Sequence, residues 1–230
     1  MTEASAAGQI PVVTIDGPSG SGKGTIASLL AERLGWHLLD SGALYRVVAA
    51  EALRTGVSLE DEAGLGRLAG ALDIRFDGES VWVDGRDLGV EIRTEVVSEA
   101  ASIVAALAPV RAAILALQRG MRRAPGLVAD GRDMGTVVFA DAPLKIYLDA
   151  SVEARAERRY NQLKNKGLTV SLRALLASLK DRDERDRARA VSPLVPARDA
   201  IVIDSTEMSI DAVLSQIVAE VEARQLRESA

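Results

Sequence analysis

The sequence of 230 residues contains no cysteine and a single histidine, His37. Without thiols the chain can form neither disulfide bonds nor thiolate metal sites, which agrees with a reducing compartment. We therefore expect a cytoplasmic protein. His37 lies within a short apolar run, Trp36 to Leu39, where a lone histidine is more typical of packing or surface exposure than of catalysis.

Long apolar runs and a basic excess are also missing. No apolar run approaches the ~20 residues that a membrane-spanning helix needs. The net charge of −5 gives no overall basic field that would collect nucleic acid. The composition thus predicts a globular protein that binds neither nucleic acid nor membrane, with room for one α/β core and an insertion or for two small domains.

The stretch that organises the chain is a glycine-rich loop. It follows the β-branched run Val12–Ile15 and precedes an amphipathic segment, Ile26 to Leu34. Between a strand and a helix, such a loop turns its backbone N–H groups inward around an anion, at the positive end of the helix dipole. Its residues, which we expect to hold the phosphates of ATP, are Gly17, Pro18, Ser19, Gly20, Ser21, Gly22, Lys23, Gly24 and Thr25.

Within this loop, Lys23 supplies a mobile charge for the terminal phosphates, and a hydroxyl can hold Mg²⁺. Gly24 follows the lysine, so the hydroxyl comes one position late, at Thr25. This Gly-Lys-Gly-Thr ending resembles nucleoside monophosphate kinases more than GTPases. The alternative is a glycine-rich turn without a ligand, but four glycines, a lysine and a threonine exceed what a turn requires.

Short apolar runs predict a five-stranded parallel sheet in a P-loop type α/β fold. The predicted strands are 10–15, 36–39, 127–129, 144–148 and 201–204. Helices are predicted between them, including 92–107, 110–123, 152–166, one that begins at Ser171, and 209–224. Alternating runs at 74–76 and 81–83 predict a hairpin and hence an inserted subdomain.

Three polar segments have two possible interpretations each. Asp40 to Arg46 is either an ordinary capped helix or a phosphate-binding helix start beside the glycine loop. Asp130 to Thr136 is either a solvated turn or a ligand site at the end of a strand. Asp181 to Arg189 alternates in charge and is either a salt-bridged helix face or part of a site.

The arginines of these segments favour a second anion site. An enzyme that moves a phosphoryl group between two phosphorylated substrates must neutralise about four phosphates, and arginine binds phosphate oxygens bidentately. Such an enzyme must also exclude water. The insert and the basic helix pair that follows Val152 are candidates for mobile flaps.

From Val12 to Val218 the chain resembles the bacterial cytidylate kinases, a family of P-loop nucleoside monophosphate kinases. The motifs that carry the resemblance are residues 15–20, 39–46, 129–136 and 182–191. The resemblance implies a discontinuous core of residues 10–60 and 107–226, a nucleoside monophosphate-binding insert of residues 61–106, and a short lid of residues 153–170. It also implies a monomer whose partners are the small nucleotides CMP and dCMP.

The resemblance implies a role for each site residue. Ser102, Arg111 and Asp133 would surround cytosine, and the CMP phosphate would meet Ser41, Arg46, Arg132 and Arg189. Arg182 and Asp186 would contact the ribose. Lys23, Arg132, Arg155 and Arg159 would be catalytic, with Arg155, Arg158 and Arg159 in the lid, and Thr25 would hold Mg²⁺ beside ATP.

The implied reaction is transfer of the γ-phosphoryl group of ATP to CMP or dCMP. Two rivals remain from the sequence. One is another small P-loop kinase that acts on UMP, AMP or a metabolite. The other is a regulatory nucleotide-binding protein without transfer, although the second arginine-rich segment argues against it.

Overall fold

The computed structural model describes residues 10–77, 80–165, 167 and 169–226. Its main sheet has five parallel strands in the order β2-β6-β1-β7-β8, which confirms the predicted sheet. The strands are β1 (Val12–Asp16), β2 (His37–Asp40), β6 (Leu127–Gly131), β7 (Leu144–Asp149) and β8 (Ile201–Asp204).

The register of the central strands positions the site. Asp16 of β1 lies beside Gly131 of β6, and Asp40 of β2 lies beside Asp130. The glycine loop, the start of the helix after β2 and the polar turn after β6 therefore leave the sheet at one edge. Ligands of open parallel sheets collect at this carboxyl edge.

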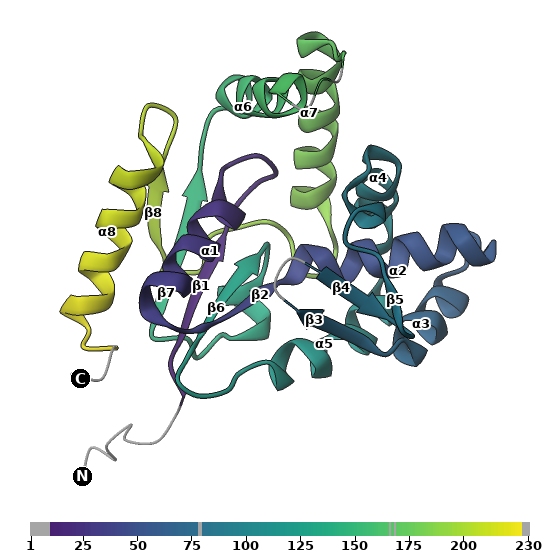
Figure 1. Ribbon diagram of the computed structural model, residues 1–230, viewed down its shortest axis with the longest axis horizontal. Coiled ribbons are helices and arrows are strands. Elements are labelled where there is room, and N and C mark those ends of the chain that lie inside the picture. The colour runs from purple at the N-terminus through teal and green to yellow at the C-terminus, as the bar shows by residue number, and fades with distance from the viewer. Residues whose placement is uncertain (1–9, 78–79, 166, 168, 227–230) are drawn as a thin grey trace.

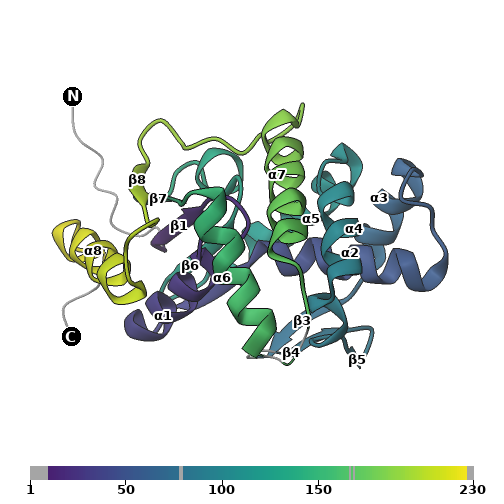
Figure 2. The ribbon, with the colours of Figure 1, turned by 90° about the horizontal axis from the view of Figure 1, so that it is seen from above.

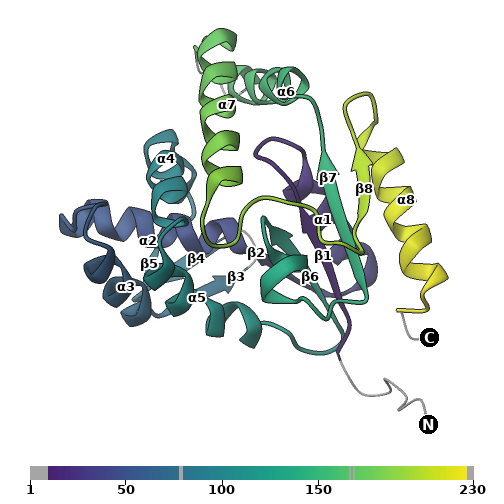
Figure 3. The same cartoon turned by 180° about the vertical axis from the view of Figure 1, so that it is seen from behind.

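Successive side chains of β1 and β6 point to opposite faces of the sheet. Both faces carry apolar side chains, and helices cover both. Val13 and Val128 pack in the cluster that α1 and α8 complete, whereas Val12 and Leu127 pack with α2, α4 and α5. Figure 1 shows α8 and the α2–α5 group at opposite ends of the molecule, and Figure 3 shows the same layers from behind. The α-helices are α1 (Lys23–Leu34), α2 (Ser41–Thr55), α3 (Glu62–Ala71), α4 (Glu95–Val104), α5 (Ala108–Gly120), α6 (Val152–Asn165), α7 (Leu172–Ala188) and α8 (Ile210–Ala223).

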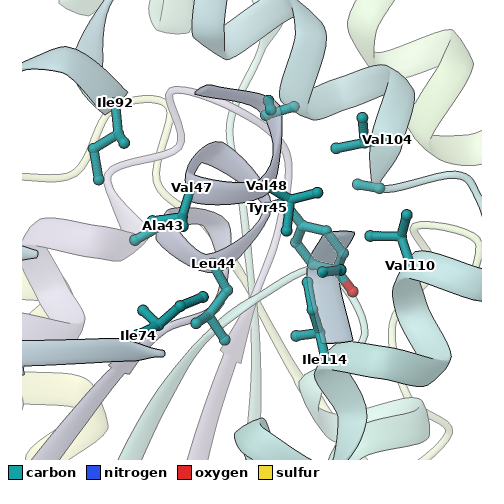
Figure 4. Packing of buried hydrophobic residues seen from close by; sticks show 14 of the residues in the cluster. Ala43, Leu44, Tyr45, Val47, Val48, Ile74, Ile92, Val104, Val110 and Ile114 are labelled. Carbon is teal, nitrogen blue, oxygen red and sulfur yellow. The ribbon is translucent and has the colours of Figure 1, made fainter. Parts of the chain in front are cut away.

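The predicted hairpin is confirmed, and it forms a second sheet of three antiparallel strands. These are β3 (Ile74–Asp77), β4 (Ser80–Val83) and β5 (Arg86–Asp87); residues 78 and 79 of the predicted turn lie outside the described residues. The side chains of this insert share one hydrophobic cluster with α2, α5 and the main sheet. Figure 4 shows Ile74 near Leu44 of α2, and Ile114 of α5 beside Tyr45.

The predicted helix 92–107 is wrong in its extent. A short 3-10 turn, η1 (Glu91–Arg93), ends before Thr94, and α4 begins at Glu95. Thr94 is extended, and its hydroxyl accepts a hydrogen bond from Val97 N. The chain therefore starts a new helix here, because a threonine in this conformation is an N-cap.

The helices α6 and α7 form a hairpin over the glycine loop, as Figure 1 shows from the side and Figure 2 from above. Ser171 begins α7 as predicted, since its hydroxyl accepts a hydrogen bond from Ala174 N. Lys166, where the preceding helix was predicted to end, lies outside the described residues. In the described ranges no single helix is long and apolar enough to cross a membrane, and the one pair that passes on length and composition, α4 with α5, is bent by 100°.

The shared hydrophobic cluster predicts a contrast within α5. Ile114 is 1 % exposed, whereas Leu117, one turn away, is 37 % exposed. We expect Ile114→Ala to lower the free energy of unfolding by about 2–5 kcal/mol, because truncation leaves a cavity. Leu117→Ala should lower it by about 1 kcal/mol or less. Urea unfolding measures both, and equal losses would contradict the assignment of this cluster.

Candidate active site

The glycine loop curves tightly between β1 and α1. A Cβ on Gly17 would lie 2.1 Å from the carbonyl oxygen of Leu148, so only glycine fits beside β7. Gly20 and Gly22 have φ values of 80° and 93°, in the left-handed region that favours glycine. Gly22 is the N-cap of α1. The N-terminal N–H groups of α1 thus face the space that the loop encloses, as the sequence predicts.

Lys23 is a buried cation at the base of this loop. Its Nζ donates a hydrogen bond of 3.1 Å to the carbonyl oxygen of Pro18. Burial, assisted by the charge of Arg132, lowers the pKa of Lys23 to about 7, while Asp130 opposes the shift. Burial raises the pKa of Asp130 to about 7, opposed by the charge of Lys23. Phosphate groups in the loop would restore the charge on Lys23, because an adjacent anion favours the charged form.

A cleft of about 660 Å³ opens from the loop. One wall is the α6–α7 hairpin and the other is formed by α2, α4 and the turn after β6. Among the described residues, the arginines that line the cleft are Arg46, Arg132, Arg158, Arg159 and Arg182. An apolar end beyond the loop contains Met208, Ile210 and Val213.

The alternating run on α7 is not only a solvated helix face, since Arg182 lines the cleft and Asp186 is buried. Asp186 is 1 % exposed; it accepts a hydrogen bond of 3.0 Å from Arg132 Nε and a further one from Arg189. Burial and the charge of Arg132 lower the pKa of Arg182 to about 10. One carboxylate therefore organises cations from β6 and α7 that would otherwise repel one another.

Two of the predicted cytosine residues, Arg111 and Asp133, meet at a buried position. Arg111 of α5 forms an ion pair with Asp133 and donates 3.1 Å to the carbonyl oxygen of Ala105. Its guanidinium lies 5.6 Å from the ring centroid of Tyr45. The hydroxyl of Ser102 is buried without a hydrogen-bond partner in the described part of the chain. Unsatisfied groups of this kind suit a polar ligand.

At the start of α2, the two residues predicted to bind a phosphate, Ser41 and Arg46, lie in different surroundings. Asp40 is the N-cap and accepts from Ala43 N. Ser41 is buried, and its Oγ accepts a hydrogen bond of 2.9 Å from Gln118 Nε2. Arg46 lines the cleft and lies 3.5 Å from the carbonyl oxygen of Ile92. Arg46 thus faces the cleft, while the hydroxyl of Ser41 is held by α5.

The three predicted lid arginines differ in position. Arg155 does not line the cleft: it forms a buried ion pair with Asp183 and donates 2.9 Å to the carbonyl oxygen of Ser19 in the glycine loop. Arg158 donates to the carbonyl oxygen of Ser21 at 3.2 Å and to Ser205. Arg159 extends across the cleft to Glu95 of α4. Of these, Arg158 and Arg159 lie where a nucleotide could reach them.

Sequence reasoning missed Asp16 as a positioning group. Both of its carboxylate oxygens accept hydrogen bonds of 2.8 Å, from Met134 N and Gly135 N. Burial raises its pKa to about 6, opposed by these two bonds. Asp16 therefore fixes the turn that carries Arg132 and Asp133 to the strand that carries the glycine loop. Its place directly before Gly17 was the available signal.

A magnesium ion would find few protein ligands here. The described residues contain no group of three or more His, Cys, Asp or Glu side chains arranged for a metal. Thr25 lines the cleft, as does Asp130, whose Oδ1 has no hydrogen-bond partner among these residues. Mg²⁺ typically uses one or two protein oxygens together with phosphates and water. The oxygens present therefore fit an ion that arrives with a nucleotide.

The parallel sheet, the glycine loop that leads into α1 and the facing arginines define a P-loop kinase. Residues 13–223 match the family model described as cytidylate kinase. The cytidylate kinase of Aeromonas hydrophila is 59 % identical over 216 residues, covering 92 % of this chain and 94 % of that protein. That of Pseudomonas entomophila is 57 % identical, covering 95 % and 98 %. The chain belongs to the cytidylate kinase family.

Similarity to solved structures is more distant. The crystal structure of an uncharacterized protein from Eubacterium ventriosum has a TM-score of 0.50 at 12 % identity, covering 93 % of this chain and 99 % of that chain. This likeness concerns the fold alone.

The lowered pKa of Lys23 predicts proton uptake on nucleotide binding. At pH 8 a group with a pKa of about 7 is mostly neutral, and phosphates should recharge it. We expect uptake of roughly 0.5–1 proton per Mg²⁺-free ATP at pH 8 and less at pH 6. Calorimetry in buffers of different ionisation enthalpy measures it. Lys23→Arg, which stays charged, should lose this uptake; unchanged uptake would assign the proton to another group.

The Arg155–Asp183 pair predicts a loop-holding role that can be measured separately from transfer. Asp183→Asn removes the charge that fixes Arg155 against Ser19 O, and we expect ATP affinity to fall about tenfold, equivalent to ~1.4 kcal/mol. Glu184→Gln, at the exposed neighbouring position, is the matched control and should bind normally. Titration calorimetry measures both, and normal affinity in Asp183→Asn would show that this pair does not hold the loop.

Proposed function

We propose that this protein transfers the γ-phosphoryl group of ATP to CMP or dCMP and releases ADP with CDP or dCDP. The observation that carries the proposal is that one cleft is lined both by the glycine loop and by arginines outside that loop. The glycine loop with Lys23 would bind one set of phosphates, and Arg46, Arg132 and Arg182 would bind another. A protein that only hydrolysed ATP would have no use for the second set.

ATP, the phosphoryl donor, would bind in the part of the cleft that lies around α1 and the start of α8. The triphosphate would lie on the backbone N–H groups of the loop, with Mg²⁺ near Thr25. The adenine would extend toward Met208 and Ile210, where the lining is apolar. Arg158, fixed to Ser21 and Ser205, offers a planar cation beside this base.

The acceptor nucleotide would be bound by arginines that the proposed ATP site does not use. Arg46, Arg132 and Arg189 would bind the CMP phosphate, and the ribose would meet Arg182 and Asp186. The Nε atoms of Arg182 and Arg189 are buried without a hydrogen-bond partner among the described residues. An acceptor nucleotide supplies the oxygens that these donors lack.

Base selection follows from Asp133, Arg111 and Ser102. Cytosine carries an amino donor next to a ring nitrogen and a carbonyl acceptor, so Asp133 can accept from the amino group while Arg111 donates to the acceptors. Uracil has a carbonyl in place of the amino group and would face the carboxylate of Asp133. Two hydrogen-bond acceptors that face each other disfavour binding of uracil. Asp133 would thus select cytosine, because only cytosine supplies a donor for its carboxylate.

The chemical step needs charge neutralisation more than covalent help. A CMP phosphate oxygen attacks the γ-phosphorus in line, and because this phosphate is already largely ionised at neutral pH no side-chain base is required. Lys23, Arg132 and Arg159 would neutralise the charge on the transferred group. Arg155 would serve this step by holding the glycine loop through Ser19.

The proposal extends to the setting of the enzyme. We infer a cytoplasmic monomer that acts on free nucleotides and binds neither nucleic acid nor membrane. Residues 61–106 would move as the acceptor-binding insert and residues 153–170 as the lid, so that water is excluded when both substrates are bound.

The base pocket predicts a ranked acceptor profile. In an ADP-release assay we expect CMP and dCMP to be phosphorylated well and UMP and AMP poorly. Asp133→Ala should lower kcat/KM for CMP by about 10²-fold or more, because the amino group loses its acceptor, and should affect UMP much less. Equal rates with all four nucleotides, or equal losses for CMP and UMP, would contradict the assignment of the pocket.

A further inference from the structure

The ion pair between Arg159 and Glu95 joins α6 to α4 across the cleft. Arg159 lies on α6, and Glu95 is the first residue of α4, in the insert. Both line the cleft, together with Gln162, whose Oε1 accepts 2.8 Å from Arg159 Nη1. An arginine that the proposed function assigns to the transferred phosphoryl group is therefore held by a carboxylate when no nucleotide is bound.

The surroundings of Glu95 connect it to the acceptor site. Arg46, assigned to the acceptor phosphate, is close enough to feel the charges of both Glu95 and Arg159. An acceptor phosphate bound at Arg46 would bring negative charge next to Glu95. Like charges repel, so the hold of Glu95 on Arg159 would weaken at the moment when the acceptor is present.

The exposure of the pair makes such an exchange feasible. The side chain of Glu95 is 54 % exposed and that of Arg159 is 29 % exposed. Exposed ion pairs contribute little to stability and are screened by salt. Arg159 can therefore leave Glu95 at small cost, unlike Arg155, whose ion pair with Asp183 is buried.

We propose that Glu95 is a positioning residue that withholds Arg159 from the donor's γ-phosphate until an acceptor nucleotide binds. Its role is to suppress transfer to water. The inference rests on the proposed function, because it assigns Arg159 to the transferred group. In the acceptor-free enzyme the charge of Arg159 is neutralised by Glu95, and the acceptor phosphate releases it.

The test compares CMP-independent ATP hydrolysis with transfer to CMP in the full-length enzyme, both at saturating ATP and Mg²⁺. Glu95→Gln keeps the shape of the side chain but removes its charge. We expect the ratio of hydrolysis to transfer to rise about two- to fivefold, the range that an exposed ion pair allows. Glu99→Gln, on an exposed turn of the same helix, is the matched control and should leave the ratio unchanged.

The salt dependence of the ratio of hydrolysis to transfer distinguishes an electrostatic role of Glu95 from a structural one. Raising the salt from about 0.05 M to about 0.5 M shortens the Debye length roughly threefold. The ratio should then rise in the wild type and stay nearly constant in Glu95→Gln. In an Arg159→Gln background, Glu95→Gln should have no further effect on the ratio, because the partner is gone.

Two results would overturn the inference. An unchanged ratio in Glu95→Gln would show that Glu95 withholds nothing, and a parallel fall in hydrolysis and transfer would show that it supports Arg159 instead. Failure of the wild type to phosphorylate CMP would contradict the proposed function itself. The two failures are thus distinguished by the wild-type assay.

Discussion

The architecture of the cleft depends on one electrostatic constraint: cations must be buried close together before their anions arrive. Burial, together with the charge of Arg132, lowers the pKa values of both Lys23 and Arg182. The protein meets this constraint with carboxylates. Asp130 stands beside Lys23 and Asp186 beside Arg132. While no phosphate is bound, the negative charges of these carboxylates balance the buried cations and reduce the repulsion between them.

The sheet brings these charges together through its register. Asp130 lies near the end of β6, beside Asp40 of β2 and Ile15 of β1, so residues more than a hundred positions apart in the sequence reach the same edge. Asp16 adds a second link between β1 and the turn after β6, because its carboxylate accepts hydrogen bonds from that turn while its backbone leads into the glycine loop.

The sequence predicts the strands and the glycine loop well, because both depend on local patterns: β-branched runs such as Val12–Ile15, and glycines at fixed spacing. It predicts Ser171 as a helix start for the same reason. It does not predict that Arg155 holds Ser19 or that Arg159 reaches Glu95, since these partners are set by tertiary distance. The break at Thr94 was missed because the apolar pattern continues across it and only the cap geometry reveals it.

The described residues of the insert, 61–77 and 80–106, form no hydrophobic cluster separate from the core. Leu65, Ile74 and Val81 belong to the same cluster as Leu44 of α2 and Leu127 of β6. A movement of this segment would therefore slide one packed surface past another and would not be the swing of a free-standing module. Exchanging this segment for the corresponding one of a relative would therefore disturb the packing unless the facing residues of α2 and α5 were exchanged with it.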